Sequence, residues 1–418
     1  MKIADKDIIE DVKKIFIVTA VLPPHYGGAD IAALRYAQAL AAMPGYEVKL
    51  VGEWNTALDA GKHQLYPFLL PVHWKRLPHW KSYFRHLSHY LTWINCFFST
   101  FLVFFKNRHQ FELIHCFNSS SNLTIAAILA GKILGKRVVT ETSLMHSDDP
   151  VSVLRTKGIK SLVKVHRLKG RIFLMADYYI SKSPYITAAY HKKGLEQRCL
   201  EIPYFIDSGK FYPASFTEKK GLRDTLKLPA TASIILFVGG INPRKGVHIL
   251  VEAFQQIMAD FPAAFLLLVG PTDKYDPTYP AQIEAAIAKS GSEKARLVAG
   301  NSTIVDQYMR ASDIYCLPSF REGFPISNIE AMAAGLAVVA SDIPEIKDNQ
   351  IRDGENGLVF STGSSEDLAL KLASVLRNDV LRQSLVKQAS EEAETKYNLS
   401  HITQRYLECY RLGLNKRL

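Results

Sequence analysis

The sequence predicts an α/β protein with two Rossmann-like domains, each built on a doubly wound parallel sheet. Short runs of consecutive apolar residues, typical of buried parallel strands, alternate with helical segments along the chain. The alternation stops in a polar segment at 208–231 and then restarts. A length of 418 residues also exceeds one ordinary core, so about two or three domains are expected.

The first predicted domain covers residues 1–208. Its strands are expected at 15–20, 47–52, 111–117, 136–142, 176–183 and 199–207, and two of its helices at 31–42 and 123–134. After the first strand, Gly27 and Gly28 form a turn that suits an anion, although an ordinary turn explains the two glycines as well. The polar segment at 145–160 is expected to be mobile.

Residues 73–108 mix basic and aromatic side chains and then run apolar. The apolar run at 91–105 is too short and too polar to span a bilayer. Basic residues beside aromatic ones are typical of an interfacial helix that binds an anionic membrane. A buried helix with a solvated basic approach is the alternative.

The second predicted domain covers residues 209–397. Strands are expected at 233–240, 264–270, 295–300, 313–318, 337–341 and 357–360, with helices at 247–261, 281–289 and 304–312 and a charged helical region at the end. Two such sheets joined by a connector predict a ligand cleft between their carboxyl edges.

The most informative segment, at 319–335, is SFREGFPISNIEAMAAG. It places Glu322 and Glu330 on either side of a loop-to-helix junction, at the edge where open α/β sheets bind ligands. A helix that begins near 325–327 points free N–H groups at an anion, and the carboxylates can accept hydrogen bonds from vicinal hydroxyls. Alternatively, Ser327 and Glu330 form only a capping box, and Glu322 is a solvated loop charge.

A second segment, at 239–246, is GGINPRKG, which follows a strand and precedes a helix. Arg244 offers a bidentate fork for phosphate and Lys245 a point charge, framed by Gly240 and Gly246. A solvated basic turn is the alternative. Together the two segments supply cations for a diphosphate and carboxylates for hydroxyls, which describes a nucleotide sugar.

Both segments resemble signatures of one family. PSFREGFPISNIEAMAAGLAVVASD resembles the E-x7-E segment, and GGINPRKGVHILVEAF the phosphate-binding segment, of retaining glycosyltransferases with the GT-B fold, family 4 type (glycosyl transferases group 1). The resemblance covers nearly the whole chain and is strongest at 233–360. It implies two domains facing across a cleft, the first for the acceptor and the second for the nucleotide sugar, with a C-terminal helix at 398–418 crossing back onto the first.

The resemblance also implies roles for individual residues. Glu322 would hold hydroxyls of the donor sugar and Glu330 those of the ribose. Arg244 and Lys245 would neutralise the diphosphate leaving group. The other donor-binding residues implied are Gly323 and Phe324, through their backbone N–H groups, and Gly240, Gly27 and Gly28.

The sequence departs from the family pattern in the first domain. Phe117 and Thr142 stand where many members carry histidines, and Ala337 replaces a common proline as a minor variation. His115 lies at a strand end that should face the cleft, so it is the candidate catalytic substitute, with His146 as the alternative. A lone histidine on a strand is more often structural, and that interpretation stays open.

The implied reaction is front-face transfer of a hexosyl-type sugar from a UDP- or GDP-sugar, in which the departing diphosphate takes the acceptor proton. No cofactor is expected, and no metal, since no D-x-D or His/Cys cluster occurs. The acceptor would be a sugar, a lipid-linked sugar or a polysaccharide precursor. An epimerase or phosphorylase of the same architecture, or an inactive binding protein, is the alternative.

Composition and charge agree with this class. A net charge of +11 suits an acidic ligand or an anionic membrane, and no motif indicates nucleic acid. Five widely spaced cysteines without a C-x-x-C pair predict free thiols, with Cys116 and Cys316 buried in strands. The charged first fourteen residues lack a signal-peptide core, so we expect a cytoplasmic protein, working at the inner face of the membrane if it binds lipid.

Overall fold

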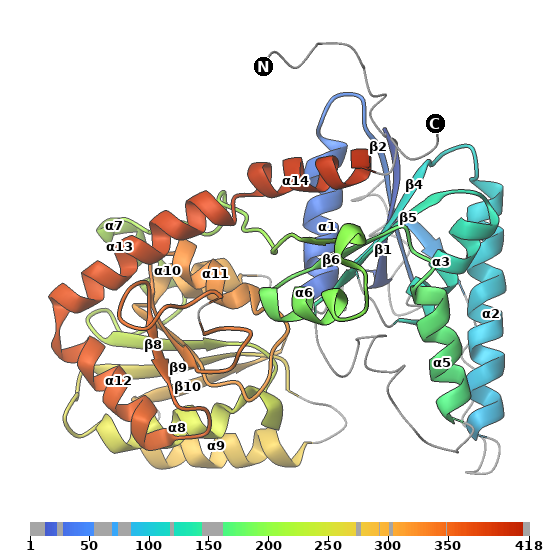
Figure 1. Cartoon of the computed structure of the whole chain (residues 1–418). Coiled ribbons are helices and arrows are strands. Elements are labelled where there is room, and N and C mark those ends of the chain that lie inside the picture. Colours follow the sequence, from blue (N-terminus) through green and yellow to red (C-terminus); the bar gives the residue numbers. More distant parts are fainter. Residues whose placement is uncertain are drawn as a thin grey trace. The chain divides into compact units, whose positions relative to one another are not determined.

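The computed structural model describes residues 13–22, 28–53, 69–73, 85–117, 121–143, 162–272, 277–291, 293–300, 304–347 and 349–412. The chain divides into two compact units, each with its own parallel sheet (Figure 1). The first unit combines Met1–Pro203 with Ile402–Leu418, and the second is Tyr204–His401. The predicted α/β class with two doubly wound sheets is confirmed, whereas the acceptor and donor roles of the two units stay predictions.

The first unit contains a parallel sheet of seven described strands in the order β3-β2-β1-β4-β5-β6-β7. The order reverses direction between β1 and β4, as in doubly wound folds, because the chain winds first to one edge and then to the other. The strands are β1 (Lys14–Val21), β2 (Glu47–Glu53), β3 (Leu69–Val72), β4 (Leu113–Cys116), β5 (Arg137–Thr142), β6 (Tyr178–Ser181) and β7 (Cys199–Glu201).

Helices cover both faces of this sheet (Figure 1). One face is covered by α1 (Gly28–Ala41) and by the C-terminal helix α14 (Leu399–Leu412), and the other by α3 (Asn122–Ile133), against which α2 (Arg85–Lys106) and α5 (Leu162–Phe173) pack. The short helix α6 (Pro184–His191) and the 3₁₀ turn η2 (Glu196–Arg198) connect β6 to β7. Most of α14, from Ile402 on, belongs to the first unit.

The second unit contains a parallel sheet of six described strands in the order β10-β9-β8-β11-β12-β13, which reverses between β8 and β11. The strands are β8 (Ser233–Val238), β9 (Ala264–Gly270), β10 (Ala295–Ala299), β11 (Ile314–Leu317), β12 (Ala337–Ser341) and β13 (Leu358–Phe360). Strands β9, β11, β12 and β13 are buried throughout and β8 over its four central residues, which explains their continuous apolar runs, whereas the edge strand β10 is mostly only partly buried.

The helices of the second unit also lie on both faces of its sheet (Figure 1). They are α7 (Phe216–Thr225), α8 (Val247–Ile257), α9 (Thr278–Ser290), α10 (Val305–Ala311), α11 (Ile326–Ala333), α12 (Ser365–Arg377) and α13 (Asp379–Lys396), with a 3₁₀ turn η3 (Pro243–Lys245) before α8. The expected polar connector at 208–231 therefore contains a helix, α7, that packs on α10.

Two features differ from the sequence prediction. The edge strand β3 was not predicted, because it has four residues and contains Pro71, which only an edge position tolerates well. The strand expected at 199–207 is limited to β7. The segment expected to be mobile, 145–160, lies outside the described residues.

The prediction that Cys116 and Cys316 are buried free thiols is confirmed. They lie within β4 and β11. Cys96 and Cys409 are also buried and free, and Cys199 is partly buried. Burial raises the pKa of the Cys199 thiol to about 11, so this thiol stays protonated near neutral pH.

Candidate functional site

The two motif segments meet at the switch point of the second sheet. The Arg–Lys turn follows β8, and the E-x7-E loop follows β11, and these two strands are neighbours in the sheet. In open α/β sheets, ligands bind outside the carboxyl ends of the strands at this point. The topology alone therefore brings both predicted half-sites together.

The Arg–Lys turn is held in one conformation by its own sequence. The side chain of Asn242 accepts a hydrogen bond from the backbone N–H of Lys245 and so caps the 3₁₀ turn. Gly246 ends the turn with φ +64°, and a Cβ there would lie 2.0 Å from the carbonyl oxygen of Pro318. Only glycine fits this close approach to the end of β11.

The two loops are also bonded directly to each other. The backbone N–H of Phe320 donates to the carbonyl oxygen of Arg244 at 2.9 Å. The guanidinium of Arg244 in turn donates to the carbonyl oxygen of Arg321 at 2.6 Å. The cationic turn and the acidic loop therefore form one rigid constellation.

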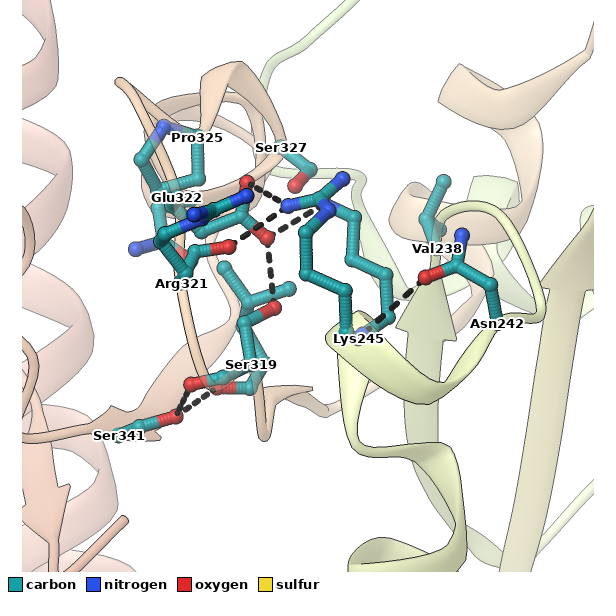
Figure 2. Close-up of polar contacts among 12 residues, drawn as sticks. Val238, Asn242, Lys245, Ser319, Arg321, Glu322, Pro325, Ser327 and Ser341 are labelled. Carbon is teal, nitrogen blue, oxygen red and sulfur yellow. Dashed lines mark hydrogen bonds and ion pairs between the residues drawn. The ribbon is translucent and has the colours of Figure 1, made fainter. Parts of the chain in front are cut away.

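Glu322 lies at the centre of this constellation (Figure 2). Its Oε1 is 2.6 Å from Lys245 Nζ and accepts a 2.6 Å hydrogen bond from the Ser319 hydroxyl, and its Oε2 is 3.2 Å from Arg244 Nη1. The Glu322 side chain is 7% exposed and that of Arg244 is 38% exposed. Because it reaches the surface, the guanidinium can approach a ligand without leaving the loop.

Charge compensation keeps Glu322 ionised. Burial by itself would raise the pKa of this carboxyl, but Lys245 and Arg244 outweigh burial and hold the pKa below its usual value. The three side chains together carry one net positive charge, which favours an anionic ligand. The interpretation of Glu322 as a solvated loop charge is therefore wrong.

The capping-box alternative is also wrong. Helix α11 begins at Ile326 with Pro325 at the N-cap position and no side-chain cap, so Ser327 lies inside the first turn. A capping box needs the serine at the N-cap itself. Glu330 lies in the same helix and is 8% exposed, and its proposed ribose contact stays a prediction.

The backbone before α11 is suited to the anion contact predicted for it. Among the residues that the structure describes, no hydrogen-bond acceptor is found for the N–H groups of Gly323 and Phe324. The Phe324 ring is 6% exposed and packs edge-on against Tyr204 and Tyr397, which fixes the loop. Gly240, in the Arg–Lys turn, is partly exposed.

The glycine turn of the first unit is described only in part. Gly27 and His146 lie outside the described residues, so the structure gives no account of them. Gly28 is the exposed first residue of α1. Two residues later, Asp30 accepts hydrogen bonds from the Thr19 hydroxyl and from the N–H of Ala20, which ties the start of α1 to β1.

The expectation that His115 faces the cleft is wrong. Its side chain has no exposed surface. Nδ1 lies 2.6 Å from the Tyr410 hydroxyl of α14, and Nε2 lies 3.0 Å from Glu141. Both ring nitrogens therefore face protein groups, and His115 cannot contact a substrate in this conformation. Burial lowers the pKa of His115 more than Glu141 raises it, so the ring is neutral near pH 7.

His115 belongs to a buried polar cluster that the sequence did not reveal. Glu141 of β5 lies 2.8 Å from the ammonium of Lys182, which donates to the Tyr406 hydroxyl of α14 at 2.7 Å. Lys182 and Glu141 have no exposed surface. The signal available in the sequence was the presence of charged residues inside apolar strand runs, which requires a partner.

Helix α2 has two different sides. Cys96, Thr100 and Phe104 are buried, on the side that packs on α3. On the other side lies an apolar stripe spaced by three or four residues and exposed by 40–57%, which consists of Leu91, Ile94, Phe98, Leu102 and Phe105. The helix contains no acidic residue. The interpretation as a buried helix therefore holds for one side of α2 only, and its membrane role stays a prediction.

Two further expectations concern a membrane-spanning helix and a metal site. None of the helices in the described ranges combines the length and the apolar character that crossing a bilayer requires. Nor do those ranges contain three or more His, Cys, Asp or Glu side chains grouped to hold a metal ion.

Comparison with known proteins points to one family for the second unit. Residues 218–392 match the model of the family described as "Glycosyl transferases group 1". The phosphatidyl-myo-inositol mannosyltransferase of Mycobacterium leprae is 35% identical over 191 residues, which are 44% of this chain and 47% of that protein. The chain spans about half the length of the curated relatives it matches.

Solved structures resemble the chain over nearly its whole length. HepE of Anabaena, solved in complex with UDP and glucose, has a TM-score of 0.75 at 18% identity and covers 95% of this chain and 99% of its own. WaaG, a glycosyltransferase involved in lipopolysaccharide biosynthesis, has a TM-score of 0.67 at 19% identity, with coverages of 94% and 98%. At these identities the likeness establishes the fold, and the predicted GT-B type with two Rossmann-like domains is confirmed.

Proposed function

We propose that this chain is a retaining glycosyltransferase, which moves a hexosyl-type sugar from a UDP- or GDP-sugar to an acceptor hydroxyl. The observation that carries the proposal is the contact of Glu322 with both Arg244 and Lys245 at the switch point of the second sheet. The family of residues 218–392 and the UDP complex of HepE support the same donor class.

The geometry supports catalysis by charge stabilisation. Arg244 and Lys245 would neutralise the diphosphate as it leaves, assisted by the N–H groups of Gly323 and Phe324. A carboxylate offers about four acceptor positions. Glu322 uses three of them for Ser319, Lys245 and Arg244, which leaves capacity for a sugar hydroxyl. The departing diphosphate takes the acceptor proton, so no enzymic nucleophile, metal or cofactor is required in this mechanism.

The acceptor we propose is lipid-linked and is reached at an anionic membrane. The exposed apolar stripe of α2 supports this, since an acid-free helix with such a face suits the interface of an anionic bilayer. One relative is named for its action on phosphatidyl-myo-inositol, and WaaG for lipopolysaccharide. The free cysteines favour a reducing compartment, which supports the cytoplasmic side of the membrane.

The proposal is tested by incubating the purified full chain with UDP- and GDP-sugars and following nucleoside-diphosphate release, with and without lipid-linked acceptors. Release that depends on both a donor and an acceptor is the expected result. The same release should continue in the presence of EDTA, because the mechanism uses no metal. Abolition by EDTA would contradict metal independence while leaving the transfer itself in place.

The same assay separates the alternatives. An epimerase would convert the donor sugar without releasing the nucleotide, and a phosphorylase would need inorganic phosphate. An inactive binding protein would release no nucleotide from any donor. The proton and carbon spectra of the product would show whether the anomeric configuration is retained.

A further inference from the structure

A buried tyrosine connects the two motif segments. Tyr315 lies on β11 and has no exposed surface. Its hydroxyl donates to the Ser327 hydroxyl at 2.7 Å and lies 3.4 Å from the carbonyl oxygen of Val238, the last residue of β8. Tyr315 therefore links the strand that precedes the Arg–Lys turn to the first turn of α11.

This arrangement fixes the proton of the phenol. Burial raises the pKa of Tyr315 well above its ordinary value, so the hydroxyl stays protonated near neutral pH. A phenol has one proton to donate, and the shorter contact, to Ser327, takes it. Ser327 Oγ is then an acceptor in this bond, and its own proton is directed elsewhere.

That proton has no partner in the described part of the chain. A serine within a helix commonly donates to the carbonyl three or four residues earlier. For Ser327 those residues are Phe324 and Gly323, which precede the helix, and neither carbonyl accepts from it. The side chain is partly exposed, so the hydroxyl can meet a ligand.

The surroundings of Ser327 are those of the proposed donor site. Figure 2 shows Ser327 in the same cluster as Glu322 and Lys245. Both motif carboxylates, Glu322 and Glu330, act electrostatically on the Tyr315 hydroxyl that holds Ser327, and both raise its pKa, although less than burial does. The free hydroxyl proton thus lies among the groups proposed to bind the nucleotide sugar.

We infer that Ser327 donates its hydroxyl proton to a phosphate oxygen of the nucleoside diphosphate, and that Tyr315 is a positioning residue that orients this hydroxyl. The inference rests on the proposed function and adds a neutral donor to its two cations. Such a donor distinguishes phosphate oxygens by direction, whereas Lys245 acts as a point charge.

The test is titration calorimetry of the wild-type full chain with UDP and GDP. The affinity of each variant is then measured for the nucleotide that the wild type binds. Ser327→Ala should weaken binding of the diphosphate about tenfold, since a hydrogen bond to a charged group is lost. Ser327→Thr should restore most of the affinity. Binding of the corresponding nucleoside, which has no phosphate, should not change in either variant.

Tyr315→Phe separates positioning from packing. It should weaken diphosphate binding less than Ser327→Ala does. Adding it to Ser327→Ala should cause no further loss, because Tyr315 acts only by orienting the Ser327 hydroxyl proton. Should Tyr315→Phe fold poorly, the Ser327 variants still test whether the serine hydroxyl contacts the diphosphate.

Unchanged diphosphate affinity in Ser327→Ala, or an equal loss of affinity for the nucleoside, would overturn the inference. A wild type that binds neither UDP nor GDP would instead contradict the proposed function.

Discussion

Glu322 is the side chain on which both motif segments converge. Its contacts with Lys245 and Arg244 could be anticipated, because their segments follow strands that are adjacent at the switch point. The bond between Ser327 and Tyr315 could not, because Tyr315 reads in the sequence only as one more apolar strand residue. Side-chain hydroxyl partners depend on packing that no local pattern encodes.

Removing a cation from this cluster should reduce catalysis strongly. Arg244→Ala is expected to lower kcat/KM for nucleotide-sugar turnover by about 10²–10³, the usual effect of losing one charge-stabilising donor. Arg377→Ala is the matched control, since Arg377 is an exposed residue of the same unit that pairs with Asp260 and lies over the Phe261 ring. Equal activity of the two variants would show that Arg244 does not face the leaving group.

The ionisation of Glu322 predicts a pH dependence of stability. Its folded-state pKa is lower than the ordinary value of 4.5, so its contribution is present above that value and is lost as pH falls through the folded pKa. The difference in unfolding free energy between wild type and Glu322→Gln should therefore be constant from pH 7 to about pH 5 and shrink below it. Urea unfolding at several pH values measures this. A difference that already shrinks between pH 7 and 6 would contradict the assigned shift.

At the scale of elements, most strands of both sheets follow from the apolar runs and their spacing, with the edge strand β3 as an exception. The position of α14 explains why His115 was misjudged. Tyr410, which contacts His115, lies 295 residues away in sequence. A strand-end histidine is thus contacted by a helix from the far end of the chain.

The buried cluster should make α14 important for the stability of the first unit. Tyr410→Phe leaves His115 Nδ1 without its partner in the interior, which should cost about 1–3 kcal/mol of unfolding free energy. Tyr185→Phe, at an exposed tyrosine of α6, serves as the control and should change little. Chemical denaturation of the three proteins compares them. Equal stabilities would mean that the cluster is not coupled to α14.

The outer stripe of α2 predicts lipid binding. Phe98→Ser combined with Leu102→Ser should weaken binding to vesicles rich in phosphatidylglycerol by at least about tenfold, because two large apolar side chains no longer enter the interface. Leu370→Ser, at a residue of α12 that is 71% exposed, is the control and should bind as the wild type does. Cosedimentation at equal protein concentration gives the comparison.

Two further results of that experiment would count against the membrane proposal. One is binding of the wild type that does not depend on anionic lipid. The other is equal binding of the stripe variant and the control. Either result would leave α2 as a packing helix and would direct the search for an acceptor to soluble sugars.

For the molecule as a whole, the fold is the part that sequence reasoning predicts best, and the donor class stays a proposal. Parallel sheets have continuous apolar strands and place their loops at one edge, so motif positions translate into a site. The acceptor is harder to predict, because in the proposed function it would be bound by side chains of the first unit. In that unit, Phe117 and Thr142 stand at the two positions where many family members carry a histidine, and both residues are buried.

The central claim is that the second unit binds a nucleoside diphosphate through its paired cations, Arg244 and Lys245. The most direct test is titration calorimetry with UDP and GDP, carried out on the wild-type full chain and on its Lys245→Ala variant. We expect one of the two nucleotides to bind at a single site and Lys245→Ala to weaken it by about a hundredfold or more. Binding of neither nucleotide, or equal binding by the variant, would contradict the account.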